Sequence, residues 1–329
     1  MRIIRKPEIA AALSNINIQE LVLNQEDAFA AYSQGNAIVP PVGHMEFLKP
    51  PGECHIKYGY IRDTDVFVIK VASGFYDNSI NGLPAGDGLL LIFSQKTGIL
   101  EAILLDEGHL TNVRTAVAGL IAAKYLAPKR VYGIGIFGTG CQAKLQLEYL
   151  KIGLKPLDCK NVWVWGRSMD KLNSYRQESE TLGLNIQLTT DAEAIVKNCN
   201  LIITTTAAKQ ALFNADLVRP GTHITAIGTD SPGKQELDPQ VFKYADICVV
   251  DSMRQCGEYG DVSYAIKEPI IPEDKLVELG KLISNPKLGR KNDQQITVAD
   301  LTGIAVQDIK IAMLINNRLK ESSETIYSS

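Results

Sequence analysis

The sequence predicts an α/β protein in which a doubly wound parallel sheet is combined with a discontinuous α+β domain. Short apolar segments alternate with amphipathic segments between residues 131 and 299, which is typical of repeated βαβ units. β-rich segments without intervening helices precede them, between residues 54 and 105. We therefore expect residues 116–303 to form the parallel-sheet domain, and residues 1–115 together with 304–329 to form the other.

The amino-terminal domain should contain a mainly antiparallel sheet. A helix begins near Pro7, and the periodicity of residues 18–34 indicates a second one. Turn residues 96–98 join the last two of four expected strands: 54–61, 66–73, 88–94 and 99–105. An Ala-rich helix follows over residues 110–126 and leads to the parallel-sheet domain.

The expected strands of the parallel sheet are 131–137, 162–165, 185–188, 201–205, 223–227, 247–250 and 296–299. The last helix, residues 304–319, comes after this sheet has ended. Its side chains are too apolar for a free surface, so we expect it to pack on the amino-terminal domain.

Composition narrows the function classes. The 329 residues are 45% apolar, and 34 basic against 37 acidic residues give a formal net charge of -3. The basic residues form no stripe of the kind that binds nucleic acid, so we do not expect a nucleic-acid partner. No segment is apolar enough to span a bilayer, and the amino terminus lacks the apolar run of a signal peptide, so we expect a cytoplasmic protein without a membrane partner. Six cysteines and four histidines lack metal-ligand spacing, which predicts reduced thiols and no metal.

A glycine-rich turn after the strand at residues 131–137 predicts a dinucleotide site. Two registers of the fingerprint overlap, and only Gly138, Gly140 and Ala143 leave an apolar strand before the turn and an amphipathic helix after it. Such a Rossmann-type turn offers helix amides to a pyrophosphate. The expected cofactor-binding residues are Gly138, Thr139, Gly140, Gln142, Ala143, Arg167, Ser168, Thr205 and Gly228.

The end of the second parallel strand favours NADP(H) over NAD(H). In this fold an acidic residue there binds the ribose hydroxyls of NAD, whereas an arginine accommodates the phosphate of NADP. This chain has Arg167 and Ser168 at that position, with Lys171 one helical turn further. The alternative is that Arg167 stacks on the adenine or caps a helix in an NAD enzyme. We therefore predict NAD(P)(H), with NADP(H) preferred.

Four further segments carry a resemblance to a known family: Phe67 to Lys70, Leu110 to Ala116, Ala226 to Leu237 and Val298 to Asp308. With them the chain resembles the ornithine cyclodeaminase/mu-crystallin family over nearly its whole length. The resemblance implies chemistry at the bond between the α-carbon and the nitrogen of an amino acid. It also implies a homodimer, for which the apolar strands 89–93 and 99–105 supply a face that needs covering.

The resemblance implies roles for three residues. Lys70 and Arg114 would hold the substrate carboxylate, and Asp230 would be the acid/base group beside the α-nitrogen. The residue types suit these roles, because a carboxylate can take the proton of an amine and stabilise the resulting iminium. Structural alternatives remain: Asp230 capping a turn, Arg114 paired with Asp106 or Glu107, and Lys70 facing outward from its strand.

The chain departs from the family at one position. Family members usually have an arginine near Gly43 that helps to hold the carboxylate, and this chain reads Pro-Val-Gly-His there. Lys57, on a strand next to that of Lys70, could replace it with weaker directional control. His44 and His55 could contact the substrate, or they could be ordinary hairpin histidines. Catalytic residues are thus expected at Asp230 and Lys70, and substrate-binding residues at Arg114, Lys57 and His44.

Three functions compete. The first is an NAD(P)-dependent oxidoreductase that interconverts a small amino acid and its imine or cyclic imine. The second is a cyclodeaminating lyase, which releases ammonia and returns the hydride to the substrate. The third is a binding protein without catalytic activity, which the crystallin branch of the family suggests. We rank them in that order.

Overall fold

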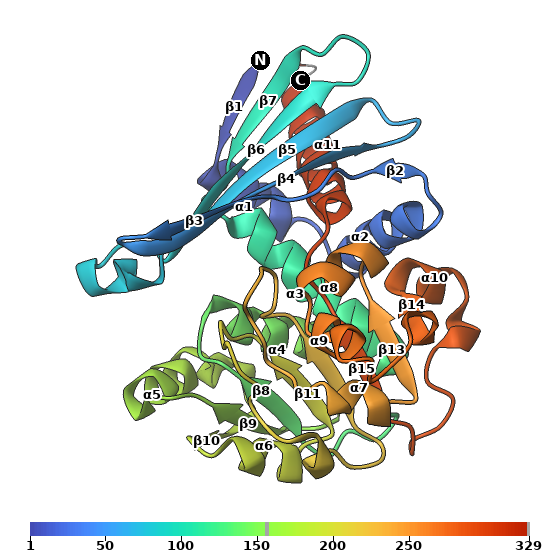
Figure 1. Ribbon diagram of the computed structural model, residues 1–329. Helices are drawn as coiled ribbons and strands as arrows, with labels where there is room; N and C mark the ends of the chain where they lie inside the picture. The colour runs from blue at the N-terminus through green and yellow to red at the C-terminus, as the bar shows by residue number, and fades with distance from the viewer. Residues whose placement is uncertain (155–157, 328–329) are drawn as a thin grey trace. The chain divides into compact units, whose positions relative to one another are not determined.

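The computed structural model describes residues 1–154 and 158–327, and it divides the chain into two compact units (Figure 1). Unit 1 consists of Met1–Arg114 and Ile304–Ser329, and unit 2 of Thr115–Gly303. One division falls inside helix α3 (His109–Leu126) and the other immediately before helix α11 (Ala305–Tyr327). Within the described residues, no helix combines the length and the apolarity that a membrane crossing requires.

Unit 1 is built on a seven-stranded sheet in the order β1-β7-β6-β5-β4-β2, with β3 paired to β4. Only the pairing of β1 with β7 is parallel. The strands are β1 (Arg2–Arg5), β2 (Ala37–Ile38), β3 (Gly43–Leu48), β4 (Pro51–Ile61), β5 (Val66–Gly74), β6 (Gly86–Ser94) and β7 (Leu100–Leu105).

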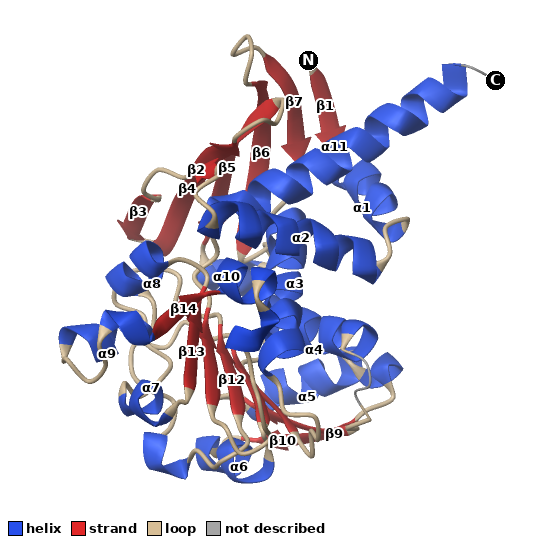
Figure 2. Ribbon diagram, turned by 90° about the vertical axis from the view of Figure 1, so that its right-hand side faces the viewer, coloured by secondary structure: helices blue, strands red, loops and turns tan. Residues whose placement is uncertain are grey.

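Three helices of unit 1 lie on one face of this sheet (Figure 2). They are α1 (Lys6–Ser14), α2 (Ile18–Ser33) and α11, while a 3-10 turn spans Tyr76–Asn81. Asn17 caps α2 by accepting a hydrogen bond from the Glu20 amide at 2.9 Å, which fixes where this helix starts. Helix α11 packs against α2, β4 and β5, as its apolar sequence predicts.

The two faces of this sheet differ in what they carry. On the helix-covered face one row of paired residues crosses five strands: Ile4, Leu104, Leu90, Lys70 and Lys57. All five are buried, so two lysines end an otherwise apolar row. On the opposite face the corresponding row is Ile3, Ile103, Leu91, Ile69 and Tyr58. None of these five is buried, and Ile3 is 52% exposed.

Unit 2 contains an eight-stranded sheet in the order β10-β9-β8-β11-β12-β15-β13-β14, and every pairing in it is parallel. The order reverses between β8 and β11, which is where ligands bind in such sheets. The strands are β8 (Ile134–Phe137), β9 (Asn161–Trp165), β10 (Asn185–Thr189), β11 (Leu201–Thr204), β12 (His223–Ala226), β13 (Ile247–Val250), β14 (Leu276–Glu278) and β15 (Thr297–Asp300).

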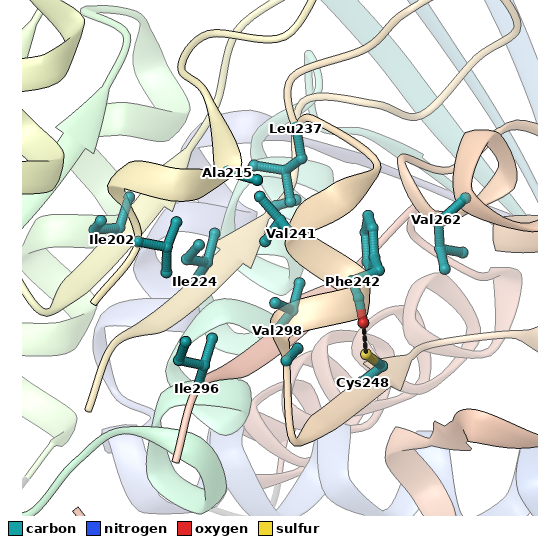
Figure 3. Packing of buried hydrophobic residues seen from close by; sticks show 14 of the residues in the cluster. Ile202, Ala215, Ile224, Leu237, Val241, Phe242, Cys248, Val262, Ile296 and Val298 are labelled. Carbon is teal, nitrogen blue, oxygen red and sulfur yellow. Dashed lines mark hydrogen bonds between the residues drawn. The ribbon is translucent and has the colours of Figure 1, made fainter. Parts of the chain in front are cut away.

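Helices cover both faces of this sheet, with α4 and α5 on one face and α7 and α9 on the other (Figure 2). The α-helices that lie wholly in unit 2 are α4 (Cys141–Gly153), α5 (Met169–Glu178), α6 (Ala192–Asn198), α7 (Gln240–Tyr244), α8 (Met253–Tyr259), α9 (Val262–Lys267) and α10 (Leu279–Ser284); short 3-10 turns span Glu180–Leu182, Ala215–Leu217, Glu273–Lys275 and Pro286–Leu288. Ile202, Ile224 and Val298 of the strands pack with Val241 and Phe242 of α7 in one buried cluster (Figure 3).

The predicted fold class is confirmed, with local differences. Strand β8 begins at Ile134 and not at Val131, because the Gly133 carbonyl accepts bonds from the Asn200 and Leu201 amides. A Cβ at Gly133 would lie 2.2 Å from the Asn198 carbonyl oxygen, so this approach requires glycine. Strands β1, β2, β3 and β14 were not predicted; three of them, β1, β2 and β14, have only four, two and three residues, which carry too little periodicity.

Candidate active site

Buried cations gather on the helix-covered face of the unit 1 sheet. Lys57 of β4 and Lys70 of β5 lie directly opposite each other in the antiparallel register, and they are 5% and 2% exposed. Like charges in that position repel each other. Because Lys70 is buried, the alternative that it faces outward is wrong. Lys57 and Lys70 lie on neighbouring strands, as the sequence predicts.

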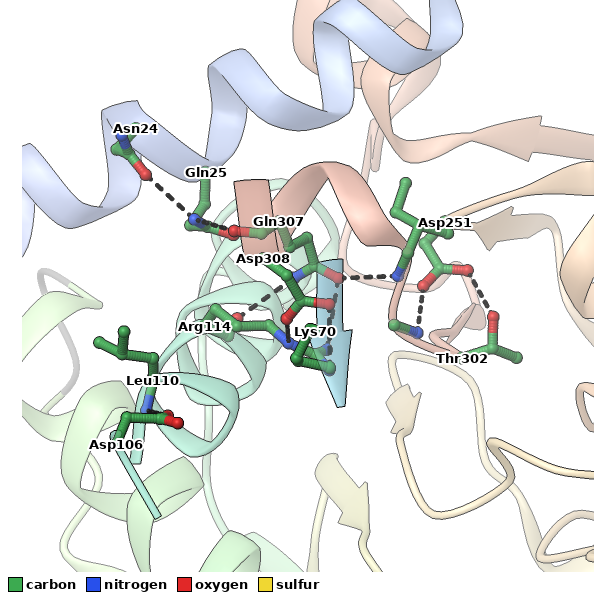
Figure 4. Close-up of polar contacts among 12 residues, drawn as sticks. Asn24, Gln25, Lys70, Asp106, Leu110, Arg114, Asp251, Thr302, Gln307 and Asp308 are labelled. Carbon is green, nitrogen blue, oxygen red and sulfur yellow. Dashed lines mark hydrogen bonds and ion pairs between the residues drawn. The ribbon is translucent and has the colours of Figure 1, made fainter. Parts of the chain in front are cut away.

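Asp308 of α11 joins Lys70 to Arg114 of α3 (Figure 4). One carboxylate oxygen lies 2.9 Å from Lys70 Nζ, and the other accepts a hydrogen bond from Arg114 Nε at 3.0 Å. Arg114 is 5% exposed and Asp308 is 1% exposed. The adjacent Gln307 donates from its side chain to the Arg114 carbonyl at 3.2 Å. We call Lys57, Lys70, Arg114 and Asp308 the cation cluster.

Charge and burial oppose each other within the cation cluster. The pKa of Lys70 is lowered to about 7: burial is the largest cause, Arg114 and Lys57 act in the same direction, and Asp308 acts in the opposite direction. Burial alone would raise the pKa of Asp308, but Arg114, Lys70 and Lys57 outweigh it and lower that pKa. The cluster thus holds three basic side chains and one carboxylate.

The acidic residues that sequence offered as partners of Arg114 have other roles. Asp106 accepts a hydrogen bond from the Leu110 amide at 2.8 Å and so caps the start of α3 (Figure 4). Burial raises the pKa of Asp106 to about 6. Glu107 pairs with Lys6 at 2.8 Å. The ion pair of Arg114 with Asp308 therefore replaces the local pairing that we considered.

His44 and His55 face each other across the β3–β4 hairpin. Their ring centroids are 4.8 Å apart in an edge-on arrangement. His55 is buried and its Nε2 lies 3.4 Å from Glu53, whereas His44 is exposed. Thus His55, two residues before Lys57 on β4, shares the covered face with the cation cluster.

The glycine turn of unit 2 has the backbone that a dinucleotide pyrophosphate requires. Gly138 has a φ of 119°, and a Cβ there would lie 2.7 Å from the Thr205 hydroxyl, so only glycine fits. Gly140 is the N-cap of α4, and a Cβ there would meet nothing within 4 Å. No N-cap side chain accepts a hydrogen bond at this end of α4, and the amides of a helix N-terminus are groups that bind a pyrophosphate. The turn therefore fits a dinucleotide.

The other expected cofactor residues lie around the carboxyl ends of the central strands. Ala143 is buried, and its carbonyl accepts a hydrogen bond from the Tyr175 hydroxyl. Thr205 donates to the Phe137 carbonyl at 2.9 Å and thereby ties the ends of β8 and β11 together. Arg167 and Lys171 are exposed after the end of β9, and Ser168 is the N-cap of α5. No carboxylate stands in the segment from Gly166 to Ser168.

Asp230 lies in the loop after β12, four residues before its ion-pair partner. Lys234 Nζ approaches the Asp230 carboxylate to 2.7 Å, and the Asp230 side chain is 39% exposed while that of Lys234 is 10% exposed. The loop therefore holds Asp230 in an ion pair with Lys234.

Two buried carboxyl groups hold this loop in shape. Glu236 accepts hydrogen bonds from the Gly228 amide at 2.8 Å and from the Thr204 hydroxyl at 2.7 Å. Asp261 accepts one from the Thr229 hydroxyl at 2.7 Å and two from the Glu236 and Leu237 amides. Both residues that precede Asp230 in the chain are therefore fixed by a carboxyl group.

Both of these carboxyl groups titrate well above their ordinary range. Burial, followed by the neighbouring Asp261, raises the pKa of Glu236 to about 8, although its hydrogen-bond donors act against this. Burial raises the pKa of Asp261 to about 6. The loop that carries Asp230 therefore rests on groups that bind protons more tightly in the folded state than in the unfolded chain.

Sequence reasoning missed Asp308, Lys234, Glu236 and Asp261. A signal existed for Asp308, because a carboxylate among Ile304, Val306 and Ile309 is as costly in an apolar helix as Arg114 is in α3. Lys234 is four residues after Asp230, a spacing that brings charges together in a turn. No local sequence pattern predicts the role of Asp261, because its hydrogen-bond partners lie 24 to 32 positions away in the chain.

Histidine and cysteine side chains provide no metal centre among the described residues, where no three potential ligands are grouped. His223 shows what such residues do here: both ring nitrogens contact threonine hydroxyls at 2.9 Å. Burial lowers its pKa to about 3. It is a neutral core histidine.

Comparisons with known proteins agree with this architecture. The model of the ornithine cyclodeaminase/mu-crystallin family matches residues 8–323. An uncharacterized cyclodeaminase of Sinorhizobium fredii is 37% identical over 301 residues, which are 91% of this chain and 90% of that protein.

Two solved structures resemble the chain over nearly its whole length. An archaeal alanine dehydrogenase dimer with bound NAD has a TM-score of 0.85 and 31% identity, and the match covers 98% of this chain and 96% of that one. The Thermococcus litoralis Δ1-pyrroline-2-carboxylate reductase, in complex with NADH and L-proline, has a TM-score of 0.89 and 27% identity, and the match covers 98% of each chain.

Proposed function

This chain belongs to the ornithine cyclodeaminase/mu-crystallin family, and from that premise we propose that it is an NAD(P)-dependent oxidoreductase that interconverts a small amino acid and its imine or cyclic imine. The relatives of known structure are named as enzymes, which confirms the prediction that this chain is an enzyme. Two of them are named an alanine dehydrogenase, with bound NAD, and a Δ1-pyrroline-2-carboxylate reductase, in complex with NADH and L-proline, which supports this proposal.

The observation that carries the proposal is the gathering of three buried basic side chains in the cation cluster. Asp308 pairs with Lys70 and Arg114, Lys57 lies opposite Lys70 in the sheet, and each of the four residues is at most 5% exposed. Buried cations of this kind are stabilised by anions. In this proposal Arg114, Lys70 and Lys57 bind the substrate carboxylate, with Arg114 supplying the planar pair of donors that a carboxylate prefers. His44 contacts the polar part of the substrate.

Asp230 is the proposed acid/base group for the α-nitrogen. Its carboxylate already accepts one ammonium group, that of Lys234, at 2.7 Å. A carboxylate in such a place can bind a substrate ammonium or iminium, take its proton when the amino acid is oxidised, and return the proton when the imine is reduced. Glu236 and Asp261 keep the loop around it in shape and so maintain the direction of the carboxylate.

The glycine turn, Thr205 and Gly228 would hold the dinucleotide, with the first amides of α4 binding its pyrophosphate. When bound, the nicotinamide accepts a hydride from the α-carbon or donates one to it. Arg167, Ser168 and the nearby Lys171 favour NADP(H), because a ribose phosphate would meet two positive charges and no carboxylate stands at the strand end from Gly166 to Ser168. Titration of the protein with NADPH and NADH, followed by nicotinamide fluorescence, tests this preference: tighter binding of NADH would contradict it.

A homodimer is part of the proposal. The uncovered face of the unit 1 sheet carries an apolar row from Ile3 to Tyr58 and a stacked ring pair, Phe67 and Phe93, with centroids 4.8 Å apart. Large apolar faces of this kind are normally covered by a partner. The related archaeal alanine dehydrogenase is a dimer. Sedimentation equilibrium measures the mass in solution, and a monomer at micromolar concentration would contradict this part.

A second function is favoured by one observation: the relative from Sinorhizobium fredii is named a cyclodeaminase. A cyclodeaminase also needs a site for the α-carboxylate and a group beside the nitrogen. Net redox chemistry separates the two functions, because the lyase returns the hydride to its own substrate.

The test is a screen of small amino acids with NAD⁺ and NADP⁺ and of the corresponding cyclic imines with NADH and NADPH. Net reduction or oxidation of the nicotinamide supports the oxidoreductase. Ammonia release without a net change in the nicotinamide supports the lyase. Tight NADPH binding without turnover of any of these substrates would contradict both and would leave a ligand-binding protein.

A further inference from the structure

Asp308 occupies an unusual place for a carboxylate. It lies in the first turn of α11, the helix that covers the unit 1 sheet, and it is 1% exposed. Each of its oxygens contacts a different cation, Lys70 of β5 on one side and Arg114 of α3 on the other (Figure 4). One side chain thus connects three elements that are far apart in the sequence.

The contact with Arg114 fixes a direction. A guanidinium group is planar, and its Nε bond to Asp308 at 3.0 Å fixes one edge of that plane. Gln307 adds a second hold through its bond to the Arg114 carbonyl. Gln307 is itself tied to α2, since its carbonyl accepts from Gln25 at 3.2 Å. The directions in which the remaining guanidinium donors project follow from this arrangement.

The contact with Lys70 supplies charge. Four charged or titratable side chains act on the Lys70 ammonium: Asp308 from α11, Arg114 from α3, Lys57 from β4 and Asp106 from the end of β7. Arg114, Lys57 and burial all disfavour its protonated form, and Asp308 is the carboxylate in contact with it. Removing that carboxylate would leave the ammonium among like charges in a buried site.

We propose that Asp308 is a positioning residue of the reaction: it orients Arg114 and provides the countercharge of Lys70, so that both can bind the substrate carboxylate. The inference rests on the proposed function, since it concerns the same substrate group. Asp308 does not bind the substrate carboxylate itself, because two carboxylates repel each other and both of its oxygens already contact cations.

Asp308→Asn keeps the shape of the side chain and removes its charge. We expect the KM for the amino or imino acid to rise about 10- to 100-fold, since charged hydrogen bonds that hold the binding groups are weakened. The turnover number should stay within about threefold, because Asp308 does not touch the reacting atoms. The matched control is Asp27→Asn, which breaks an exposed ion pair between α2 and α11 (Asp27 with Lys310, 3.0 Å) and should leave both constants unchanged.

The pH dependence of KM separates positioning from a merely structural role. The pKa of Lys70 is lowered to about 7, mainly by burial, so the wild-type KM should rise as the pH increases through that value. In Asp308→Asn the rise should begin at least about one pH unit lower, because the opposite charge that favoured the ammonium is gone. A loss of stability alone would lower the melting temperature without moving this transition. An unmoved transition with an unchanged KM would overturn the proposal.

Asp308→Glu keeps the proposal testable if the asparagine variant does not fold. It retains the charge and displaces the carboxylate by one carbon, so the pH of the transition should stay and the KM should rise severalfold. A wild-type KM in Asp308→Glu, measured on folded protein, would contradict the positioning role. Failure of the proposed function has a different signature, because the wild-type protein would then turn over none of the substrates in the screen.

Discussion

The cation cluster of unit 1 and the Asp230 loop of unit 2 hold their charges by different means. In the cluster, one buried carboxylate serves two cations that come from a strand and a helix distant in sequence. In the loop, Asp230 and Lys234 are four residues apart, and Asp230 is the more exposed partner. Tertiary packing therefore creates the first arrangement, and local chain geometry creates the second.

This difference assigns different sensitivities to the two regions. The cation cluster is buried and holds three basic side chains, which suits a permanent binding site for an anion. The loop leaves its carboxylate partly open to water, which suits a group that must exchange a proton. Substitutions in the cluster should mainly change substrate affinity, and substitutions in the loop should mainly change the rate.

The largest expected effect is on the rate. Asp230→Asn should lower kcat about 100- to 10,000-fold, because the amide cannot take a proton from the amine or return it to the imine. The dissociation constant of NADPH should not change. Steady-state assays and fluorescence titration measure the two quantities.

Asp216→Asn is the control for this rate effect, since Asp216 is an exposed carboxylate of the same unit. If Asp230→Asn retained most of the wild-type kcat, the Asp230 loop could not be assigned to the chemical step.

An intermediate effect is expected on affinity. Arg114→Lys keeps the charge but loses the planar pair of donors, so the KM for the amino acid should rise about 10- to 100-fold while kcat changes little. The control is Arg130→Lys, which alters an exposed arginine. A fall in kcat with an unchanged KM would mean that the cation cluster takes part in the chemical step and is not an anchor.

The smallest effect concerns stability. Glu236 has a pKa of about 8 in the folded state, against an ordinary value of 4.5, so the folded state binds more protons between these values. The free energy of unfolding of unit 2 should therefore fall as the pH rises through this window, by at most about 1.4 kcal/mol per pH unit for this group. Glu236→Gln should remove that contribution.

Urea unfolding at pH 6, 7 and 8 measures it, and the fluorescence of Trp163 and Trp165 reports on unit 2, which contains both tryptophans of the chain. Glu193→Gln, which breaks an exposed ion pair with Lys197, is the control. Equal slopes for wild type and Glu236→Gln would show that Glu236 is ionised throughout this range.

Periodicity and turn chemistry were enough to predict the parallel sheet, the glycine turn and the nearness of Lys57 to Lys70. These features depend on residues close together in the chain or on alternation along a strand. The resemblance drew attention to Arg114, but the partners that the sequence suggested for it, Asp106 and Glu107, are close to it in the chain. Asp308 is 194 positions away, and only the packing of α11 on the sheet brings it there.

The limits are clearest in the Asp230 loop. The segment from Ala226 to Leu237 draws attention to Asp230, yet it does not reveal that Asp261 binds the Thr229 hydroxyl from 32 positions away. Nor does it show that Glu236 ties the loop to the end of β11 through Thr204. Buried carboxyl groups with several backbone partners leave no periodic mark in a sequence.

The pairing of β4 with β5 sets Lys57 and Lys70 side by side at the end of an apolar row. Successive residues of a strand point to opposite faces, so inserting or deleting a single residue in one of these strands would carry its lysine to the uncovered side. A change in the length of β4 or β5 would therefore remove a lysine from the cation cluster even if the sheet still formed. The connecting residues 62–65 should therefore tolerate substitution far better than any alteration in their number.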